Sequence, residues 1–531
     1  MRKKLLRLWH TVRWLRPVQF YGRVWFRLAR PRPDLSVAPA LRGPAAVWRG
    51  CARAPSMTGE HSFRFLGVER ELAAAGDWNR SDWSKLWLYN AHYFDDLAAD
   101  GATARVVWHQ ALIGRWITEN PPGQGNGWEP YPSSLRIVNW IKWSLGGNPL
   151  EPAAVHSLAV QARYLRRRLE IHLLGNHLWA NAKALVFVGA FFEGDEAAAW
   201  LHKGAVLVER ELAEQFLSDG GHFERSPMYH SILLEDVLDL VQLDRIYPGI
   251  LPTTLVARLR EGVGPMVRWL RVMTHPDGDI ALFNDAALGI APPLAALEHY
   301  ARALSVPIDN APLAPLEVLP ESGYVRMTAG PAVMIADVGP VGPDYLPGHA
   351  HADTLSFELS LHGQRVLVNG GTSTYEAGPL RLQQRGTAMH NTVEVDGQDS
   401  SEVWSSFRVA RRARPMNIRW AEEAGILVLE AAHDGYLRLP GRVMHSRRWE
   451  LSDGGLTVID ALSGRAQEAV ARYRFVPGLD ADSIGFAWRN EGAAAATVPG
   501  AWYPRFGEEH PCRVLECRIS HGQMSTEFSW R

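Results

Sequence analysis

The sequence is poor in cysteine and nearly balanced in charge, and these two features exclude several classes of protein. Its only cysteines are Cys51, Cys512 and Cys517, too few to specify a disulfide framework. A formal net charge of −1 gives no global field that would attract nucleic acid, so nucleic acid is not an expected partner. The longest apolar run, residues 184–192, is far shorter than the roughly 20 residues that cross a bilayer, so no transmembrane span is expected.

The first 33 residues are basic and aromatic, and they lack the pattern of a signal peptide. No uninterrupted apolar stretch precedes a small-residue cleavage site. A cytoplasmic location, or one at the inner membrane surface, is therefore favoured, and the periplasm is the alternative. Basic and aromatic side chains suit peripheral contact with a membrane surface. A surface helix packed on its own domain explains the same residues equally well.

The chain is too long for one ordinary core, and its pattern changes near residue 305. Apolar residues at helical spacing, separated by short Gly, Pro and Asn breaks, predict a helical toroid before that point. Short alternating β-branched runs predict an antiparallel β-sandwich after it. The fold class is therefore α+β multidomain, with lead-in helices over 1–75, the toroid over 76–305 and the sandwich over 306–531. Helices are expected at 104–118, 153–170, 178–193, 200–216, 233–243 and 254–273, and strands at 323–327, 332–338, 354–360, 364–368, 392–396, 425–431, 456–460 and 470–475.

Residues 348–371, GHAHADTLSFELSLHGQRVLVNGG, carry the most chemically informative pattern of the chain. His349, His351 and Asp353 recur at every second position, and alternate residues of a strand face the same side. His390 stands just before a second strand-like run at 392–396. Clustered imidazoles and a carboxylate are suited to proton transfer or to metal binding.

Two segments of the helical part combine polar and aromatic residues. Trp128, Arg136 and Asn139 belong to one segment, in which the arginine and the asparagine are one helical turn apart. They indicate either a wall that binds sugar and carboxylate or a corner where helices pack. Asn176 and His177 open a predicted helix, where the asparagine either caps the helix or donates its amide to a carboxyl group.

A third segment, residues 220–230, places Glu224, Arg225, Tyr229 and His230 directly before or within the start of an apolar helix. A buried tyrosine with a satisfied hydroxyl is the structural explanation, but this density of polar groups favours a functional one. A glycosidase would need two facing carboxylates. The candidates for such a pair all lie at Gly or Pro turns, where acidic residues are common for local reasons: Glu129, Asp277, Asp279 and Asp285.

Taken in order, these segments resemble the heparinase II/III-like polysaccharide lyases. The family pattern includes an incomplete (α/α) toroid followed by an antiparallel β-sandwich. The segments that carry the resemblance are Trp128–Trp140, Asn176-His177, Gly220–His230 with its Glu-x-Ser-Pro-x-Tyr-His core, Phe283-Asn284-Asp285, His349–Asp353 and Arg385 to Thr392.

The resemblance implies β-elimination at a uronic or aminouronic acid within an acidic polysaccharide, which leaves an unsaturated uronate end. The C5 proton is very weakly acidic unless the adjacent carboxylate is neutralised. Asn176 matches the neutralising asparagine, Tyr229 the catalytic tyrosine and His349 the histidine that reaches the site from the sandwich. The residues expected to bind substrate are His177, Arg225, His230, Trp128, Arg136, Asn139 and Arg385.

The resemblance also implies a structural zinc, or another divalent metal, held by two histidines and an aspartate. By position His351 and His390 match the histidines, and Asn369 stands where the aspartate is expected. A neutral amide is a weaker zinc ligand than a carboxylate. The chain is therefore expected to hold this metal less well than the family pattern, unless Asp353 supplies the carboxylate.

Two alternatives share the same scaffold. A uronosyl C5-epimerase would remove the same proton and return one to the other face of the sugar. A non-catalytic factor that binds acidic glycan during polysaccharide assembly would need no tyrosine and histidine pair. The missing signal peptide favours a bacterial capsular polysaccharide or exopolysaccharide as substrate, and the balanced charge disfavours a densely sulfated one.

Overall fold

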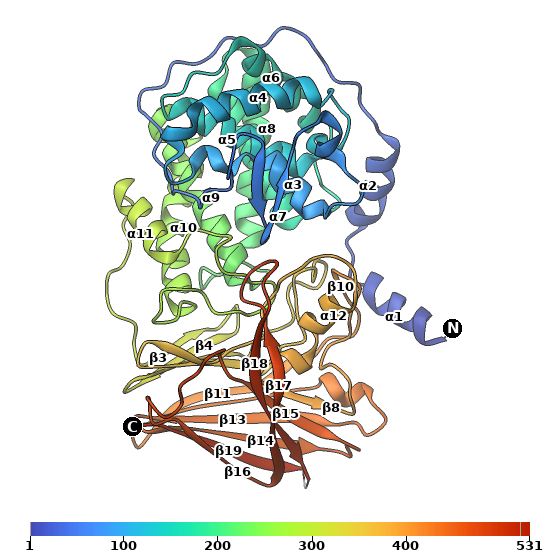
Figure 1. Cartoon of the computed structure of the whole chain (residues 1–531), viewed down its shortest axis with the longest axis vertical. Helices are drawn as coiled ribbons and strands as arrows, with labels where there is room; N and C mark the ends of the chain where they lie inside the picture. The colour runs from blue at the N-terminus through green and yellow to red at the C-terminus, as the bar shows by residue number, and fades with distance from the viewer. Residues whose placement is uncertain (1, 521) are drawn as a thin grey trace.

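The computed structural model describes residues 2–520 and 522–531, with a helical part stacked on a sheet-rich part (Figure 1). The chain begins with α1 (Arg2–Val12) and α2 (Pro17–Leu28), and a hairpin of β1 (Ser62–Phe65) and β2 (Val68–Glu71) follows. Both helices fall within residues 1–75, where lead-in helices were expected, and residues 29–61 form no helix.

The helical part confirms the helices expected from apolar periodicity. Its elements are α3 (Lys85–Tyr93), α4 (Val106–Glu119), α5 (Pro130–Leu145), α6 (Pro152–Arg166), α7 (Gly175–Phe191), α8 (Asp195–Gln215), α9 (Pro227–Ile246), α10 (Thr253–Val272) and α11 (Leu294–Ala303). All residues of α7 from Leu178 onward are buried. Glycine allows α7 and α8 to pack closely, because a Cβ on Gly189 would lie 2.4 Å from the backbone nitrogen of Leu201.

The sheet-rich part consists of antiparallel sheets around a second apolar core. One sheet has the order β3 (Leu316–Leu319), β4 (Tyr324–Ala329), β5 (Ala332–Asp337), β6 (Phe357–Leu361) and β7 (Gln364–Leu367). A second has β11 (Pro415–Glu423), β12 (Ile426–His433), β13 (Met444–Ser452), β14 (Gly455–Ser463), β19 (Gln523–Ser529) and β16 (Ala487–Glu491). A third has β17 (Ala493–Trp502), β18 (His510–Ile519), β15 (Ala469–Arg474) and β8 (Val393–Val395).

The strands expected from alternation are present. The strands β3, β9, β10, β11 and β13 and those after residue 475 were not anticipated. The short helix α12 (Pro379–Arg385) and the β9 (Val403–Trp404) and β10 (Arg408–Val409) hairpin lie between β7 and β11. No helix of the described residues is both long and apolar enough to cross a membrane. The antiparallel sheets and the helical part agree with the predicted fold class.

Two loops of the helical part dock against the first sheet and join the two halves. The guanidinium of Arg225 donates to the backbone oxygens of Glu321 and Ser322, and the hydroxyl of Tyr324 donates to the backbone oxygen of Arg225. Below them, the His275 ring contacts Glu358 and Ser360 of β6. These buried contacts bring the starts of α7 and α9 next to the loop that precedes β6.

Candidate active site

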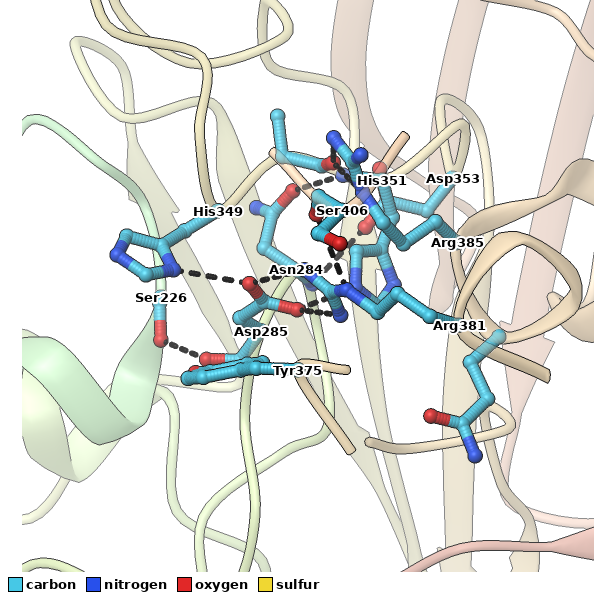
Figure 2. A network of polar contacts seen from close by, with 12 residues as sticks. Ser226, Asn284, Asp285, His349, His351, Asp353, Tyr375, Arg381, Arg385 and Ser406 are labelled. Carbon is cyan, nitrogen blue, oxygen red and sulfur yellow. Dashed lines mark hydrogen bonds and ion pairs between the residues drawn. The ribbon is translucent and has the colours of Figure 1, made fainter. Parts of the chain in front are cut away.

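His349 lies where the helical part meets the sandwich, on the loop before β6. Its Nδ1 is 2.8 Å from Oδ2 of Asp285 (Figure 2). A carboxylate can only accept a hydrogen bond, so this contact assigns the ring proton to Nδ1 and leaves a lone pair on Nε2. The side chain keeps 14% of its surface exposed, so Nε2 is the ring nitrogen available to a substrate.

Asp285 is the buried junction of the site. Oδ1 accepts from His351 Nε2 at 2.8 Å, and the guanidinium of Arg381 reaches both carboxylate oxygens at 2.5 and 2.7 Å (Figure 2). Burial by itself would raise the pKa of Asp285, but Arg381 and the two imidazoles hold it well below its ordinary value. The residue is therefore an anion that orients His349.

Tyr229 stands in the first turn of α9, with its ring 4.1 Å from that of His349 between centroids. Ser226 caps this helix by accepting the backbone N–H of Tyr229, and its hydroxyl donates to the backbone oxygen of Asp285. The Tyr229 hydroxyl is 3.2 Å from that of Tyr375. Burial raises the pKa of Tyr229 well above 10, so its hydroxyl keeps its proton at neutral pH.

Asn176 and Glu224 form the opposite side of the site. The amide nitrogen of Asn176, in the first turn of α7, is 3.5 Å from His349 Nε2. Oε2 of Glu224 lies 3.6 Å from the same ring nitrogen, and no donor within the described residues hydrogen-bonds to this oxygen. Burial raises the pKa of Glu224, although His349 and the backbone N–H of Asn176 oppose the shift.

The backbone beside each of these groups is in the left-handed region. Leu174 has a φ of 64°, Arg225 one of 58° and Asn284 one of 56°. They stand two residues before Asn176, directly after Glu224 and directly before Asp285. Such conformations cost about 1–3 kcal/mol each for a residue other than glycine, and they occur preferentially at active sites. Contacts with Tyr324 of the sandwich hold Arg225 and Asn284 in place.

Known sequence families match both halves of the chain. The "Heparinase II/III N-terminus" family matches residues 152–305, and the "Heparinase II/III-like, C-terminal" family matches residues 311–531. The chain belongs to the heparinase II/III-like family. Among solved structures of similar fold, heparinase III gives a TM-score of 0.69 at 18% identity, over 88% of this chain and 80% of that one. The heparan sulfate lyase HepC from Pedobacter heparinus gives 0.58 at 18% identity, over 97% and 87%.

Two similar proteins carry different names. The heparin-sulfate lyase of Bacteroides stercoris is 25% identical over 301 residues, which cover 51% of this chain and 42% of that protein. The FtsZ-localized protein C of Caulobacter vibrioides is 29% identical over 308 residues, which cover 55% and 49%. This heparinase II/III-like chain thus spans under half the length of either relative.

The structure brings together the three residues expected to be catalytic, Asn176, Tyr229 and His349, and their roles stay predictions. His177 is beside them and partly exposed, with Nδ1 3.2 Å from Glu170. Burial opposes protonation of this ring, but Glu170 raises its pKa. His177 therefore stays a candidate for substrate contact. His349 and His351 do converge, but on a loop rather than a strand, since β6 begins only at Phe357.

Of the two interpretations of the segment that contains Trp128, Arg136 and Asn139, the structure supports the corner where helices pack. Arg136 is fully buried, with its guanidinium on Gln161 and on backbone oxygens and stacked 3.7 Å from the Trp116 ring. The indole of Trp128 is buried and donates to a backbone oxygen. Asn139 donates to Asp95 and to a backbone oxygen. The donors of Trp128 and Arg136 are used within the protein, so the structure contradicts the substrate-binding role predicted for these two residues. Asn139 is only partly buried, and its role stays a prediction.

The other polar residues predicted to bind substrate also hold the protein together. The Arg225 side chain is turned toward the sandwich, as described above. His230 is fully buried between Met266 and the Trp269 ring, and Arg385 is fully buried with its guanidinium on the backbone oxygens of Ala350 and Ser405. Arg385 therefore supports the loop of His349 instead of contacting a sugar. These three predictions were wrong because a motif does not state which way a side chain points.

The three residues expected to bind metal do not fit a metal centre. His351 Nδ1 and His390 Nε2 face each other at 3.3 Å, and His351 Nε2 is already held by Asp285. Asn369 accepts the backbone N–H of Asn391 with its side-chain oxygen. Asp353 instead accepts the backbone N–H of Asn284. No cluster of three His, Cys, Asp or Glu side chains in residues 2–520 and 522–531 has a metal-binding arrangement.

Sequence reasoning gave no role to Asp285 and missed Arg381 and Tyr375. Asp285 was named only within the resemblance segment Phe283-Asn284-Asp285 and as a weak glycosidase carboxylate, although it lies next to the buried segment Ala281–Phe283. The other two come from the segment around α12, which has no recognisable motif. Their partners are 96 and 146 residues away in sequence, so no local pattern links them.

Proposed function

We propose that the chain is a polysaccharide lyase that cleaves a polymer containing uronic or aminouronic acid by β-elimination. The observation that carries this proposal is the convergence of a histidine lone pair, a protonated tyrosine and an amide donor. His349, Tyr229 and Asn176 come from a sandwich loop and from two different helix starts. Binding alone needs no such set, whereas β-elimination needs a base, an acid and a group that neutralises a carboxylate.

His349 is proposed as the base. Its Nδ1–H is held by Asp285, so Nε2 presents the lone pair that would accept the C5 proton. The resulting imidazolium would be stabilised by the adjacent buried carboxylate. The pair of electrons from the broken C–H bond moves into the sugar and expels the C4 oxygen, which leaves a C4–C5 double bond.

Tyr229 is proposed as the acid that protonates the departing C4 oxygen. Its raised pKa keeps the hydroxyl protonated, which suits proton donation better than proton removal. Asn176 and Glu224 are proposed to face the substrate carboxylate. A protonated Glu224, favoured by its raised pKa, could donate a hydrogen bond there beside the amide of Asn176.

A carboxylate polymer with little or no sulfate is the proposed substrate class. Arg136, Arg225 and Arg385, which could have bound sulfate, are directed into the protein. The carboxylate would then meet neutral donors, which bind a single negative charge without the cations that dense sulfate needs. A bacterial capsular polysaccharide or exopolysaccharide fits this description, met in the cytoplasm or at the inner membrane surface.

The test is the absorbance of unsaturated uronate during incubation with a panel of acidic polysaccharides. The wild-type chain should produce rising absorbance with at least one polymer. Tyr229→Phe should reduce the rate by about a hundredfold or more, since it removes the proton donor. Tyr375→Phe is the matched control. It removes the same contact between the two hydroxyls but leaves the Tyr229 hydroxyl in place, so it should keep most of the rate.

Three results would count against this assignment. Equal loss of rate in Tyr229→Phe and Tyr375→Phe would mean that turnover depends on the contact between the two hydroxyls and not on proton donation by Tyr229. Exchange of solvent deuterium into C5 without absorbance would assign the epimerase reaction instead. Binding of polymer without absorbance or exchange would assign a glycan-binding factor.

A further inference from the structure

The helix α2 packs against the protein with its less apolar side. Gln19 is buried and donates to the backbone oxygen of Tyr345, and a Cβ on Gly22 would lie 2.9 Å from Cβ of His172. Phe26 packs on the His172 ring, but most apolar residues of the helix face outward, with Trp25 65% and Leu28 76% exposed. This arrangement is the reverse of an ordinary surface helix, which buries its apolar stripe.

The outward residues form one continuous stripe, because their spacing of three and four places them on the same helix face. They are Phe20, Tyr21, Val24, Trp25 and Leu28, all exposed. Leu5, Leu8 and Trp9 of α1 repeat the same spacing and are exposed as well. Both helices lie on one edge of the molecule, and α1 projects away from it (Figure 1).

The charged residues of this segment are all positive. Residues 1–33 contain ten Lys and Arg and no Asp or Glu, although the whole chain has a net charge of −1. The remaining residues are therefore negative overall. Arg23 and Arg27 are exposed beside the stripe of α2, so positive charge borders the apolar surface. Complementary charge identifies the partner as an anionic surface.

We propose that α1 and α2 form a docking surface for a phospholipid bilayer with anionic headgroups. The aromatic residues Trp9, Tyr21 and Trp25 would enter the interface between headgroups and acyl chains, and the basic residues would contact lipid phosphates. The two contributions act together, because a short apolar stripe or a basic patch alone gives only weak attachment. The residues that contact His349 do not belong to α1 or α2, and the proposal does not depend on the proposed lyase activity.

The test is co-sedimentation of the full chain with phosphatidylcholine vesicles that contain or lack phosphatidylglycerol. We expect binding to the anionic vesicles, weakening as salt is raised, and little binding to pure phosphatidylcholine. Trp25→Ser combined with Leu28→Ser should reduce binding by about tenfold or more. Both residues are exposed, so the unfolding temperature of the variant should match that of the wild type.

Two further variants make the result specific. Trp420→Ser on β11 is the matched control, since Trp420 is 47% exposed but lies outside the basic segment, and it should bind as the wild type does. Arg23→Glu with Arg27→Glu should lose binding to anionic vesicles. The proposal is overturned if wild type binds neither vesicle, if it binds both equally, or if Trp420→Ser weakens binding as much as the α2 variant. A dimer that is lost in the α2 variant, without vesicle binding, would instead assign the surface to a second copy of the chain.

Discussion

Replacement of Asp285 by asparagine should separate catalysis from stability in this protein. The carboxylate accepts from the rings of His349 and His351 and pairs with Arg381. Asparagine keeps the size of the side chain but removes its charge. Its amide nitrogen can donate to His349 Nδ1, which would move the ring proton to Nε2 and eliminate the lone pair that faces the substrate.

The expected magnitudes follow from these contacts. Asp285 and Arg381 are fully buried, and loss of one partner of a buried ion pair costs about 3–5 kcal/mol. Loss of the carboxylate that orients a histidine base lowers turnover about ten-thousandfold in the serine protease triad, and the same logic predicts a loss of about a thousandfold or more here. The rate effect should exceed what partial unfolding explains.

The sandwich contains a matched control for this experiment. Asp460 is also fully buried, accepts from the His445 ring at 2.6 Å and pairs with Arg447 at 2.7 and 3.0 Å. Burial opposes ionisation, but Arg447 and His445 lower the pKa of Asp460 to about 2. That shift corresponds to roughly 2–3 kcal/mol of stability at neutral pH. Neither Asp460 nor its partners contact His349.

The assay combines thermal unfolding with initial rates of unsaturated-uronate formation, measured well below both unfolding midpoints. Asp285→Asn and Asp460→Asn should lower the midpoint by comparable amounts, but only Asp285→Asn should abolish turnover. The reasoning is refuted if folded Asp285→Asn keeps more than about a tenth of the wild-type rate, or if Asp460→Asn loses as much activity.

Two other outcomes are expected. Asn369→Asp should place a carboxylate where the family pattern has its aspartate ligand, so zinc should raise the unfolding temperature of this variant and not of the wild type. An equal response of both would contradict the conclusion that the wild-type residues do not fit a metal centre. Burial lowers the pKa of His92 to about 3 and of His230 to about 4. The unfolded chain therefore takes up protons below pH 6.5 while the folded chain does not, so stability should fall between pH 6.5 and 4, by about 3 kcal/mol per histidine at pH 4. A urea midpoint that does not change between pH 7 and pH 4.5 would disprove this.

Local sequence patterns were sufficient for the architecture. Apolar spacing identified α4 and α6 to α10, and alternation identified the central strands, because the period of side-chain burial differs between helix and strand. Strands such as β13 (Met444–Ser452) were missed although their burial alternates, since charged residues there occupy inward positions. Arg447 is such a case, because Asp460 pairs with it in the core.

The candidate site was predictable only where the sequence motif also determines position. Asn176 and Tyr229 each stand in the first turn of a helix, and the glycine, proline and serine around them specify that turn locally. Arg136 and Arg385 could not be assigned correctly, because a long cationic side chain can reach either a substrate or a buried carbonyl from the same backbone position.

The sequence by itself thus determined the two-part fold, the family resemblance and the chemical types available for catalysis. It did so because periodicity and short motifs are properties of neighbouring residues. Only the tertiary structure decided that Asp285 joins His349, His351 and Arg381, since these partners are 64, 66 and 96 residues away in sequence. It also decided which arginines are buried with their donors paired inside the protein, and that the apolar face of α2 is exposed to solvent. Contacts between distant segments depend on how the two halves dock, and no local pattern encodes that geometry.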